Sequence, residues 1–201
     1  QTLLSLAAIP MAMTQARPSS AATPSPAAWR MPDEAEPHAR TWMAFGAQLD
    51  IWGKRLLPVV QQDLANIAMA IARFEPVSML VRPKDMGKAS ELLKGSRVEL
   101  IEQQVDDFWV RDSGPVFVTD TQGKRAAVDF NFNGWGKKQK HAHDAKVAAF
   151  VAGRAGTPRL TTSLVLEGGG IEVDGHGTAI ITESCVLNPN RNPGVSKAAC
   201  E

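Results

Sequence analysis

The sequence contains little cysteine, no excess of charge of either sign and no long apolar run. Its two cysteines, Cys185 and Cys200, are too few for a disulfide framework and do not form a CxxC pair. The 22 Lys and Arg residues are balanced by 21 Asp and Glu residues, so we expect no nucleic-acid partner. Of the 201 residues, 44% are apolar, which is enough for the core of one soluble domain.

The N-terminal stretch has an unusual order of composition. Leu3–Met13 is apolar but shorter than the about 20 residues that cross a bilayer, and a Pro-, Ala- and Ser-rich stretch follows up to Ala28. This order predicts that residues 1–28 are the end of a secretory signal peptide and a disordered spacer. We therefore expect export to the periplasm and no stable membrane association after processing. An apolar helix of the fold is the alternative for this stretch, and a cytoplasmic location is the alternative for the protein.

Strand and helix patterns alternate over residues 29–201. Strands are expected at 41–45, 77–81, 97–101, 115–119, 126–132, 160–166, 171–173 and 178–182, and helices at 56–74, 85–94, 144–151 and from Ser196. Two of the strand pairs have hairpin connections, which make antiparallel pairs. The pattern predicts a modular α/β fold with a strand, hairpin, strand, helix, strand rhythm, and a doubly wound parallel sheet is the competing possibility.

The first candidate site is the stretch DDFWVRDSGPVFV, residues 106–118. Asp112 precedes a Gly-Pro turn that fixes its direction, and Trp109 supplies a flat apolar wall. A carboxylate beside an aromatic ring suits a planar, delocalised cation, because the carboxylate accepts two N–H bonds while the ring covers one face. The alternative is a surface ion pair between Arg111 and an aspartate, with Trp109 in the core.

The second candidate site is the stretch LEGGGIEVDG, residues 166–175. Glu167 ends an apolar strand and meets three glycines, which allow a close approach of the backbone to another group. That group could be a ligand held by Glu167. A tight hairpin with Glu167 on the surface is the alternative, and a phosphate site is disfavoured because no helix begins there.

Two further clusters resemble sites but have simpler interpretations. His141, His143 and Asp144 are better explained as a polar loop with an aspartate helix cap than as metal ligands, so no metal is expected. Cys185 is interpreted as a buried, inert thiol, because no histidine stands in an obvious partner position.

Four blocks together resemble the agmatine deiminases and bacterial peptidyl-arginine deiminases of the guanidine-modifying superfamily. They are MPDEAEPHARTWMAF, DDFWVRDSGPVFV, DFNFNGWGKKQ and LEGGGIEVDGHGTAIITESCVLNPNRNP. The resemblance implies a five-bladed propeller of ββαβ units, with residues 29–201 as the N-terminal part of the catalytic domain and about the first half of the propeller. It also implies hydrolysis of a guanidinium group through a cysteine amidino intermediate, without a cofactor. Agmatine would give N-carbamoylputrescine and ammonia.

By the same resemblance, Asp112 is a catalytic residue that grips the guanidinium, and Trp109 and Glu167 line the substrate pocket. The family's nucleophilic cysteine and its Gly-His-x-Asp block match nothing in this sequence, so we expect both catalytic groups beyond its end and the chain alone to be inactive. The expected partner is a small guanidine, agmatine or an arginine derivative. The alternatives are a non-catalytic guanidine-binding remnant, a peptidyl-arginine deiminase and an amidinotransferase. A homo-oligomer is possible, and the sequence does not decide the oligomeric state.

Overall fold

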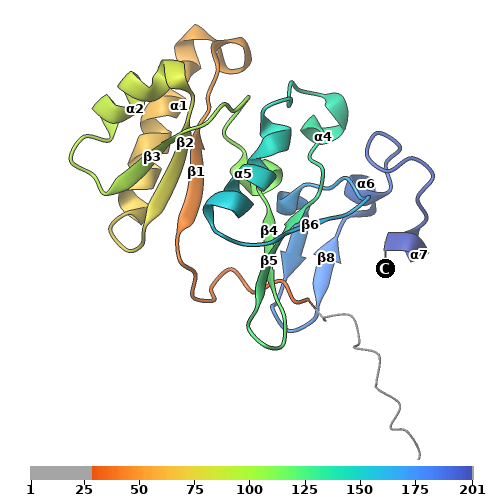
Figure 1. Ribbon diagram of the computed structural model, residues 1–201. Helices are drawn as coiled ribbons and strands as arrows, with labels where there is room; N and C mark the ends of the chain where they lie inside the picture. Colours follow the sequence, from red (N-terminus) through yellow and green to blue (C-terminus); the bar gives the residue numbers. More distant parts are fainter. Residues whose placement is uncertain (1–28, 201) are drawn as a thin grey trace, which may run out of the picture.

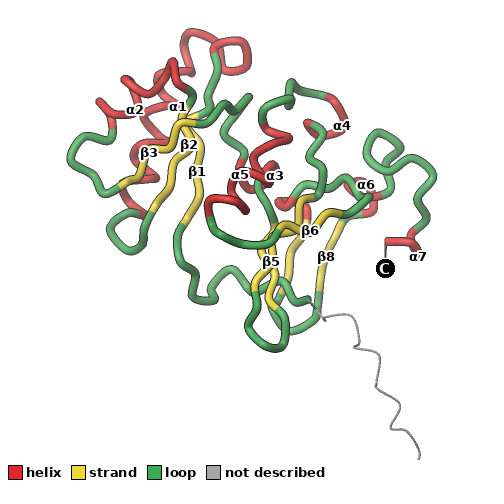
Figure 2. The backbone as a smooth tube through the Cα atoms, in the orientation of Figure 1, coloured by secondary structure: helices red, strands yellow, loops and turns green. Residues whose placement is uncertain are grey.

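The computed structural model describes residues 29–200, which form three small sheets with helices packed against them (Figures 1 and 2). The predicted signal peptide and spacer, residues 1–28, lie outside the described residues. The first sheet has the order β1-β2-β3, with β1 at Thr41–Phe45, β2 at Val77–Val81 and β3 at Val98–Glu102, all parallel. The strand β2 is buried along its whole length, as expected for the middle strand of a parallel sheet covered on both faces.

The two faces of the first sheet bury two separate cores. On one face, Phe45, Met79 and Val81 pack under the helices α1 (Leu49–Ile71) and α2 (Met86–Leu92). On the other face, Ala44 and Leu80 pack with residues of α5 (Val147–Arg154). This division follows from the alternation of side chains along a strand. Phe108 packs against both cores.

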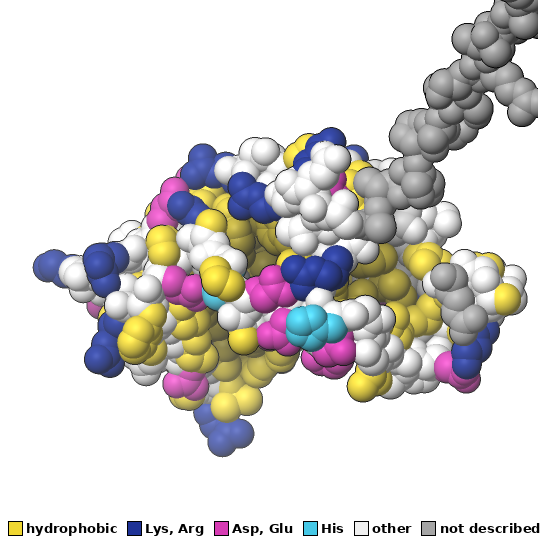
Figure 3. All heavy atoms as spheres, turned by 90° about the horizontal axis from the view of Figure 1, so that it is seen from below, with side chains coloured by type: hydrophobic (Ala, Val, Ile, Leu, Met, Phe, Trp, Pro, Cys, Tyr) yellow, Lys and Arg dark blue, Asp and Glu magenta, His cyan; other side chains and the backbone are white. Residues whose placement is uncertain are grey.

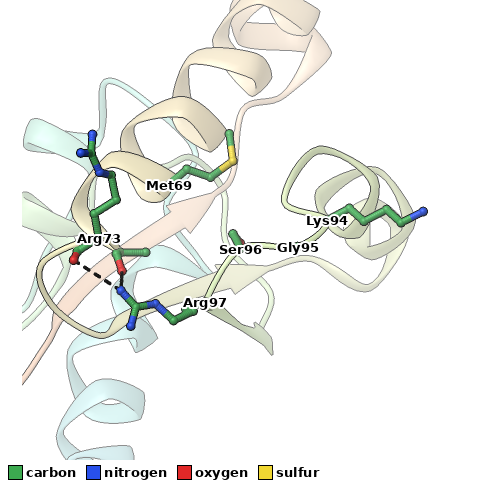
Figure 4. Close-up of a pocket in the computed structure, with 7 residues that line it drawn as sticks. Met69, Arg73, Lys94, Gly95, Ser96 and Arg97 are labelled. Atoms are coloured by element: carbon green, nitrogen blue, oxygen red, sulfur yellow. Dashed lines mark hydrogen bonds between the residues drawn. The ribbon is translucent and has the colours of Figure 1, made fainter.

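The helix α1 begins earlier than the sequence pattern predicts. It starts at Leu49 instead of Leu56, and it is broken at Gly53, which has a φ of 66°. Pro58 therefore lies about one turn after the break, where a missing N–H costs little. At the other end, Arg97 donates from Nη2 to the carbonyl oxygens of Ala72 and Arg73, at 3.0 and 3.4 Å. Figure 4 shows this guanidinium at the end of α1, with Lys94 pointing away from it.

The second sheet has the order β4-β5-β6 and contains the predicted ββαβ unit. Strands β4 (Val116–Thr119) and β5 (Arg125–Asp129) form an antiparallel hairpin, and the chain then runs through α5 to β6 (Arg159–Thr161), which is parallel to β5. Shorter turns are α3 (Val110–Ser113), α4 (Gly134–Lys137) and the 3-10 turns η1 (Pro83–Asp85) and η2 (Asp144–Lys146). The α/β class is confirmed, and the described residues form no single doubly wound sheet.

The third sheet is the hairpin of β7 (Ile171–Val173) and β8 (Ala179–Ile181), preceded by the 3-10 turn η3 (Gly168–Gly170). The helices α6 (Glu183–Val186) and α7 (Lys197–Cys200) follow. Ile180 and Ile181 of β8 are exposed. The predicted rhythm is thus complete only once, since the first unit is a βαβαβ arrangement with parallel pairing.

Two of the predicted strands are shorter than the sequence pattern indicated. The strand expected at 160–166 ends at Thr161, and the strand expected at 126–132 ends at Asp129. Asn131 has a φ of 55°, which interrupts the extended backbone, and its Nδ2 donates to the carbonyls of Thr162 and Leu164 at 2.7 and 3.0 Å. Side-chain hydrogen bonds therefore replace the strand ladder at this point.

The surface of the molecule mixes charge and apolar area. Seen from below, acidic side chains, a histidine and basic side chains gather near the middle of the face, with hydrophobic side chains around them (Figure 3). Among residues 29–200, no helix combines the length and the apolar character needed to cross a bilayer.

Candidate functional site

The loop between β3 and β4 carries the first predicted site. Trp109 immediately precedes the short helix α3, which contains Asp112, and 42% of the Trp109 residue surface is exposed. The alternative that placed Trp109 in the core is therefore wrong. Arg111 forms an ion pair with Glu34 at 2.5 Å, and both side chains are exposed. The predicted surface ion pair exists, but its acid is a glutamate from the N-terminal segment and not an aspartate.

Asp112 is half-buried and is held by donors from two other segments. Its Oδ2 accepts from the indole Nε1 of Trp135 at 3.2 Å, and its Oδ1 accepts from the backbone N–H of Gly169 at 3.2 Å. Burial raises the pKa of Asp112, and this effect outweighs the two hydrogen bonds and the charge of Arg111, which favour the carboxylate. A carboxylate has about four acceptor positions, so about two remain for a ligand.

Trp135 is the common neighbour of both residues predicted from the first stretch. Its ring meets that of Trp109 edge-on, with the centroids 6.5 Å apart and the planes at 88°, while its N–H reaches Asp112. Trp135 and Lys137 have φ values of 55° and 63°, conformations that cost free energy in residues other than glycine. Such strain is concentrated at functional sites. The sequence analysis did not assign a role to Trp135.

The strained segment is held in place by asparagines. Oδ1 of Asn133 accepts from the N–H of Gly136 at 2.7 Å, and Nδ2 of Asn133 donates to the carbonyl of Asn190 at 3.0 Å. Gly136 has a φ of 80°, and a Cβ at this position would overlap with the side chain of Asn190. The NGWG segment therefore packs against the NPNRNP segment, two of the motif blocks that are far apart in sequence.

Glu167 is buried, with 5% of its surface exposed, so the hairpin alternative with a surface glutamate is wrong. Its Oε1 accepts from Nε of Arg191 at 3.0 Å, and Nη2 of Arg191 lies 3.0 Å from the same oxygen. The side chain of Arg191 is only 9% exposed, so the two form a buried ion pair. In the described residues, the carboxylate of Glu167 is thus bound by an arginine of the chain itself, where the sequence suggested a ligand. Glu167 is followed by the glycine turn whose Gly169 donates its backbone N–H to Asp112.

The glycine run makes the close approach that the sequence predicts, but the group it approaches is the Asp112 loop. A Cβ on Gly168 would overlap with the carbonyl oxygen of Arg111, and a Cβ on Gly169 would overlap with Oδ1 of Asp112. Gly170 packs against Cys185, whose Sγ would lie 3.9 Å from a Cβ at that position. The three glycines therefore bring the two predicted sites together.

Asp107 lies in the same loop as Asp112 but was not predicted as a site residue. It is 2% exposed, and its carboxylate accepts from the indole N–H groups of Trp52 and Trp109 at 3.3 and 3.1 Å. The side-chain amide of Gln139 donates to it at 3.0 Å. Asp107 thus holds the N–H edge of the exposed Trp109 ring, and Asp112 accepts from the indole N–H of Trp135 in the same way. The doubled aspartate at 106–107 was the available sequence signal.

The His141, His143 and Asp144 cluster forms no metal site in residues 29–200, where no group of three candidate ligands is found. The prediction that Asp144 caps the following helix is wrong, because its carboxylate does not bond to its own turn. It accepts instead from the N–H groups of Asp106 and Asp107, at 2.7 and 3.1 Å. Burial raises the pKa of Asp144 to about 7.

Cys185 is half-buried in the short helix α6, and Cys200 is half-buried in α7. His176 lies in the β7–β8 turn, where its backbone N–H donates to Oδ1 of Asp174 at 2.7 Å. The hydrogen bonds of this turn lower the pKa of Asp174 to about 2. The turn therefore uses Asp174 as a backbone cap, and His176 is a residue of this turn.

Comparisons with known proteins agree with the motif blocks. The family model described as Porphyromonas-type peptidyl-arginine deiminase matches residues 30–201. The agmatine deiminase of Stutzerimonas stutzeri is 40% identical over 185 residues, which are 89% of this chain and 50% of that protein. An agmatine deiminase of Pseudomonas aeruginosa is 41% identical over 185 residues, with the same coverage. The solved agmatine deiminase of Enterococcus faecalis is 35% identical with a TM-score of 0.79, over 86% of this chain and 48% of that one. The chain spans about half the length of the curated relatives it matches.

Proposed function

The chain belongs to the Porphyromonas-type peptidyl-arginine deiminase family, and on this basis we propose that the complete protein hydrolyses the guanidinium group of agmatine. The products are N-carbamoylputrescine and ammonia. The proposal is supported by the names of the relatives and of a solved structure, which are agmatine deiminases. It is also supported by the geometry around one carboxylate of this chain.

The observation that carries the proposal is the environment of Asp112. Each of its oxygens already accepts one hydrogen bond, from Trp135 and from Gly169, which fixes the direction of the remaining acceptor positions. A guanidinium can fill these positions with two parallel N–H bonds. The exposed ring of Trp109 meets the Trp135 ring edge-on and offers a flat surface for the delocalised cation.

This arrangement suits a reaction that begins with a poor electrophile. Asp112 orients the guanidinium carbon for attack by a thiolate. The new C–S bond forms as the C–N bond to ammonia breaks, with a proton delivered to the leaving nitrogen by a histidine. Water then adds to the amidino carbon, the C–S bond breaks and the ureido product leaves. The reaction involves no oxidation or reduction, and the proposal includes no cofactor.

The thiol and the acid of this scheme are assigned to the half of the relatives' length that this chain does not match. Cys185 and His176 lie in separate elements, α6 and the β7–β8 turn, and in the described residues the side chain of Asp112 is hydrogen-bonded to Trp135 and Gly169 instead. The same proposal extends to the fold. The unit β4-β5-α5-β6 has the ββαβ order of one propeller blade, and we infer that it is one of five around a central site.

The test is an assay for the ureido product with the complete protein, using agmatine, free arginine and a peptidyl arginine as competing substrates. Asp112→Asn should lower kcat/KM for agmatine by about 100-fold or more, because it removes the charge that faces the cation. Asp120→Asn, in the β4–β5 turn, is the matched control and should be near normal. Near-normal activity of Asp112→Asn would refute the assignment, and a preference for peptidyl arginine would refute agmatine as the substrate.

Cys185→Ser should keep most of the activity.

A further inference from the structure

Asp106 and Asp144 form a reciprocal pair that joins the site loop to the start of α5. The carboxylate of Asp144 accepts from the N–H of Asp106 at 2.7 Å and from the N–H of Asp107 at 3.1 Å. In return, Oδ2 of Asp106 accepts from the N–H of His143 at 2.6 Å and from the N–H of Asp144 at 3.3 Å. Each carboxylate thus caps the backbone of the other segment, and we call this pair the brace.

The brace is costly in electrostatic terms. Asp106 is 7% exposed and Asp144 is 2% exposed, so two acids lie buried beside a third, Asp107. Burying like charges together is unfavourable unless each is compensated. Burial opposes ionisation of Asp106 too, but hydrogen bonds from the ring and backbone of His143 hold its pKa below the usual value. Three lysines, Lys137, Lys138 and Lys140, line the groove beside Asp106.

Asp144 is compensated differently. Burial raises its pKa to about 7, and the negative charges of Asp106 and Asp107 add to this effect, while the two backbone N–H bonds oppose it. The charged groups that face it are therefore Asp106 and Asp107 from the site loop, with His143 adjacent on its own segment. Burial, with a smaller effect of these two negative neighbours, therefore brings the pKa of Asp144 close to neutral pH.

The brace is connected to the substrate side by a short chain of contacts. Asp144 holds the backbone N–H of Asp107, and the carboxylate of Asp107 holds the indole N–H groups of Trp52 and Trp109. The side-chain amide of Gln48 donates to the carbonyl of Asp106, and Gly46 leaves room for the carbonyl of Asp107. The loop is therefore fixed from both sides, by the carboxylate of Asp144 on one side and by the side-chain amide of Gln48 on the other.

We propose that Asp144 is a positioning residue for the guanidine site, which acts through the brace on Asp107 and on the orientation of the Trp109 ring. This inference rests on the proposed function, because the ring matters only if it covers a bound cation. The proposal gives the cluster of His141, His143 and Asp144 a role other than metal binding. It also makes the site sensitive to the protonation of one buried acid that does not touch the substrate.

The first experiment needs no substrate. The indole N–H signals of the complete protein are followed by NMR between pH 5 and 8, after assignment with single Trp→Phe variants. Signals of Trp52 and Trp109, which both donate to Asp107, should shift together through one titration, while that of Trp42, which does not donate to Asp107, should not take part. Absence of any common titration in the unsubstituted protein overturns the proposal.

The second experiment compares Asp144→Asn with Asp120→Asn. Asp120 caps two backbone N–H groups in a turn in the same way, but it lies in the β4–β5 turn, outside the brace. Asp144→Asn should abolish the common titration and raise KM for agmatine by about tenfold with a smaller effect on kcat, since it weakens a hydrogen bond to the loop but leaves Asp112 in place. Asp120→Asn should change neither.

The outcomes separate this inference from the proposed function. If the indole signals respond but agmatine neither binds nor reacts, the brace stands as a structural link, and both the proposed function and the positioning role fall. If agmatine reacts and KM is unchanged in a folded Asp144→Asn variant, the positioning role alone is wrong. If Asp144→Asn does not fold, the titration of the unsubstituted protein and its KM as a function of pH decide, since KM should change over the same pH range as the indole signals.

Discussion

The indole N–H of Trp135 donates to Oδ2 of Asp112 across 3.2 Å and so joins two loops that are 23 residues apart in sequence. The same ring meets Trp109 edge-on. A tryptophan in a left-handed conformation, with a φ of 55°, thus determines where a half-buried carboxylate points.

Trp135→Phe should lower kcat/KM by about tenfold while keeping the fold, because it removes the N–H but keeps an aromatic ring at the place where the indole packs on Phe132 and Trp109. The lost hydrogen bond favoured the carboxylate of Asp112, so its pKa should rise further. The acidic limb of the pH profile of kcat/KM should therefore move to higher pH. Trp42→Phe is the matched control, and an unshifted acidic limb in Trp135→Phe would contradict this role of the indole.

Gly169→Ala should reduce activity with little loss of stability in the rest of the molecule. A Cβ at this position would overlap with Oδ1 of Asp112, so the carboxylate must move or lose its bond from the backbone N–H. We expect kcat/KM to fall by about 100-fold, as for a small displacement of a substrate-orienting group. Gly153→Ala in α5, where a Cβ meets nothing within 4 Å, should keep full activity and gain up to about 1 kcal/mol. Equal activities of the two variants would contradict the predicted overlap.

Glu167→Ala should destabilise the protein by about 3 kcal/mol, because it leaves the buried guanidinium of Arg191 without its acid. Urea denaturation of the complete protein measures the effect. Glu172→Ala on β7, an exposed glutamate, should stay within about 0.5 kcal/mol of the unsubstituted protein. If Glu167→Ala is fully stable but inactive, the ion pair does not stabilise the fold, and Glu167 instead has the substrate-lining role that the resemblance implies.

The stability of the protein should depend on pH through Asp144. Its pKa is raised from 3.8 to about 7 in the folded state, so the folded state holds a proton that the unfolded chain releases between these values. The contribution of this proton to the free energy of unfolding, on the order of 4 kcal/mol, is fully present below about pH 4 and is lost as pH rises through about 7. Asp144→Asn should lack this decline relative to the unsubstituted protein. If the free energy of unfolding changes equally with pH in the two proteins between pH 4 and 8, this role of Asp144 is ruled out.

The sequence was sufficient for the elements whose signal is local. The strand Val77–Val81 and the hairpin of β7 and β8 follow from apolar runs and turn residues, and they lie where the pattern places them. Asp112, Trp109 and Glu167 were marked by charge and aromatic residues next to glycine turns. The glycine run indeed makes a close backbone approach, here toward Asp112.

The parts that could not be predicted depend on contacts between distant segments. The left-handed conformation of Trp135 is fixed by Asn133 and Asn190, which no local pattern connects. The end of the strand after Thr161 depends on the side chain of Asn131. Asp144 precedes a helix and therefore reads as a cap, whereas its carboxylate bonds to a loop 38 residues away. In each case a tertiary hydrogen bond overrides the local preference.

Phe108 packs against the cores on both faces of the first sheet and is followed directly by Trp109. The hydrophobic contacts of α1 and α2 and those of α5 are therefore coupled through a single ring. While either core remains closed, the ring stays packed on it. We therefore expect the loop that carries Asp112 to open only when both cores open, and its amide protons to be among the slowest to exchange with solvent.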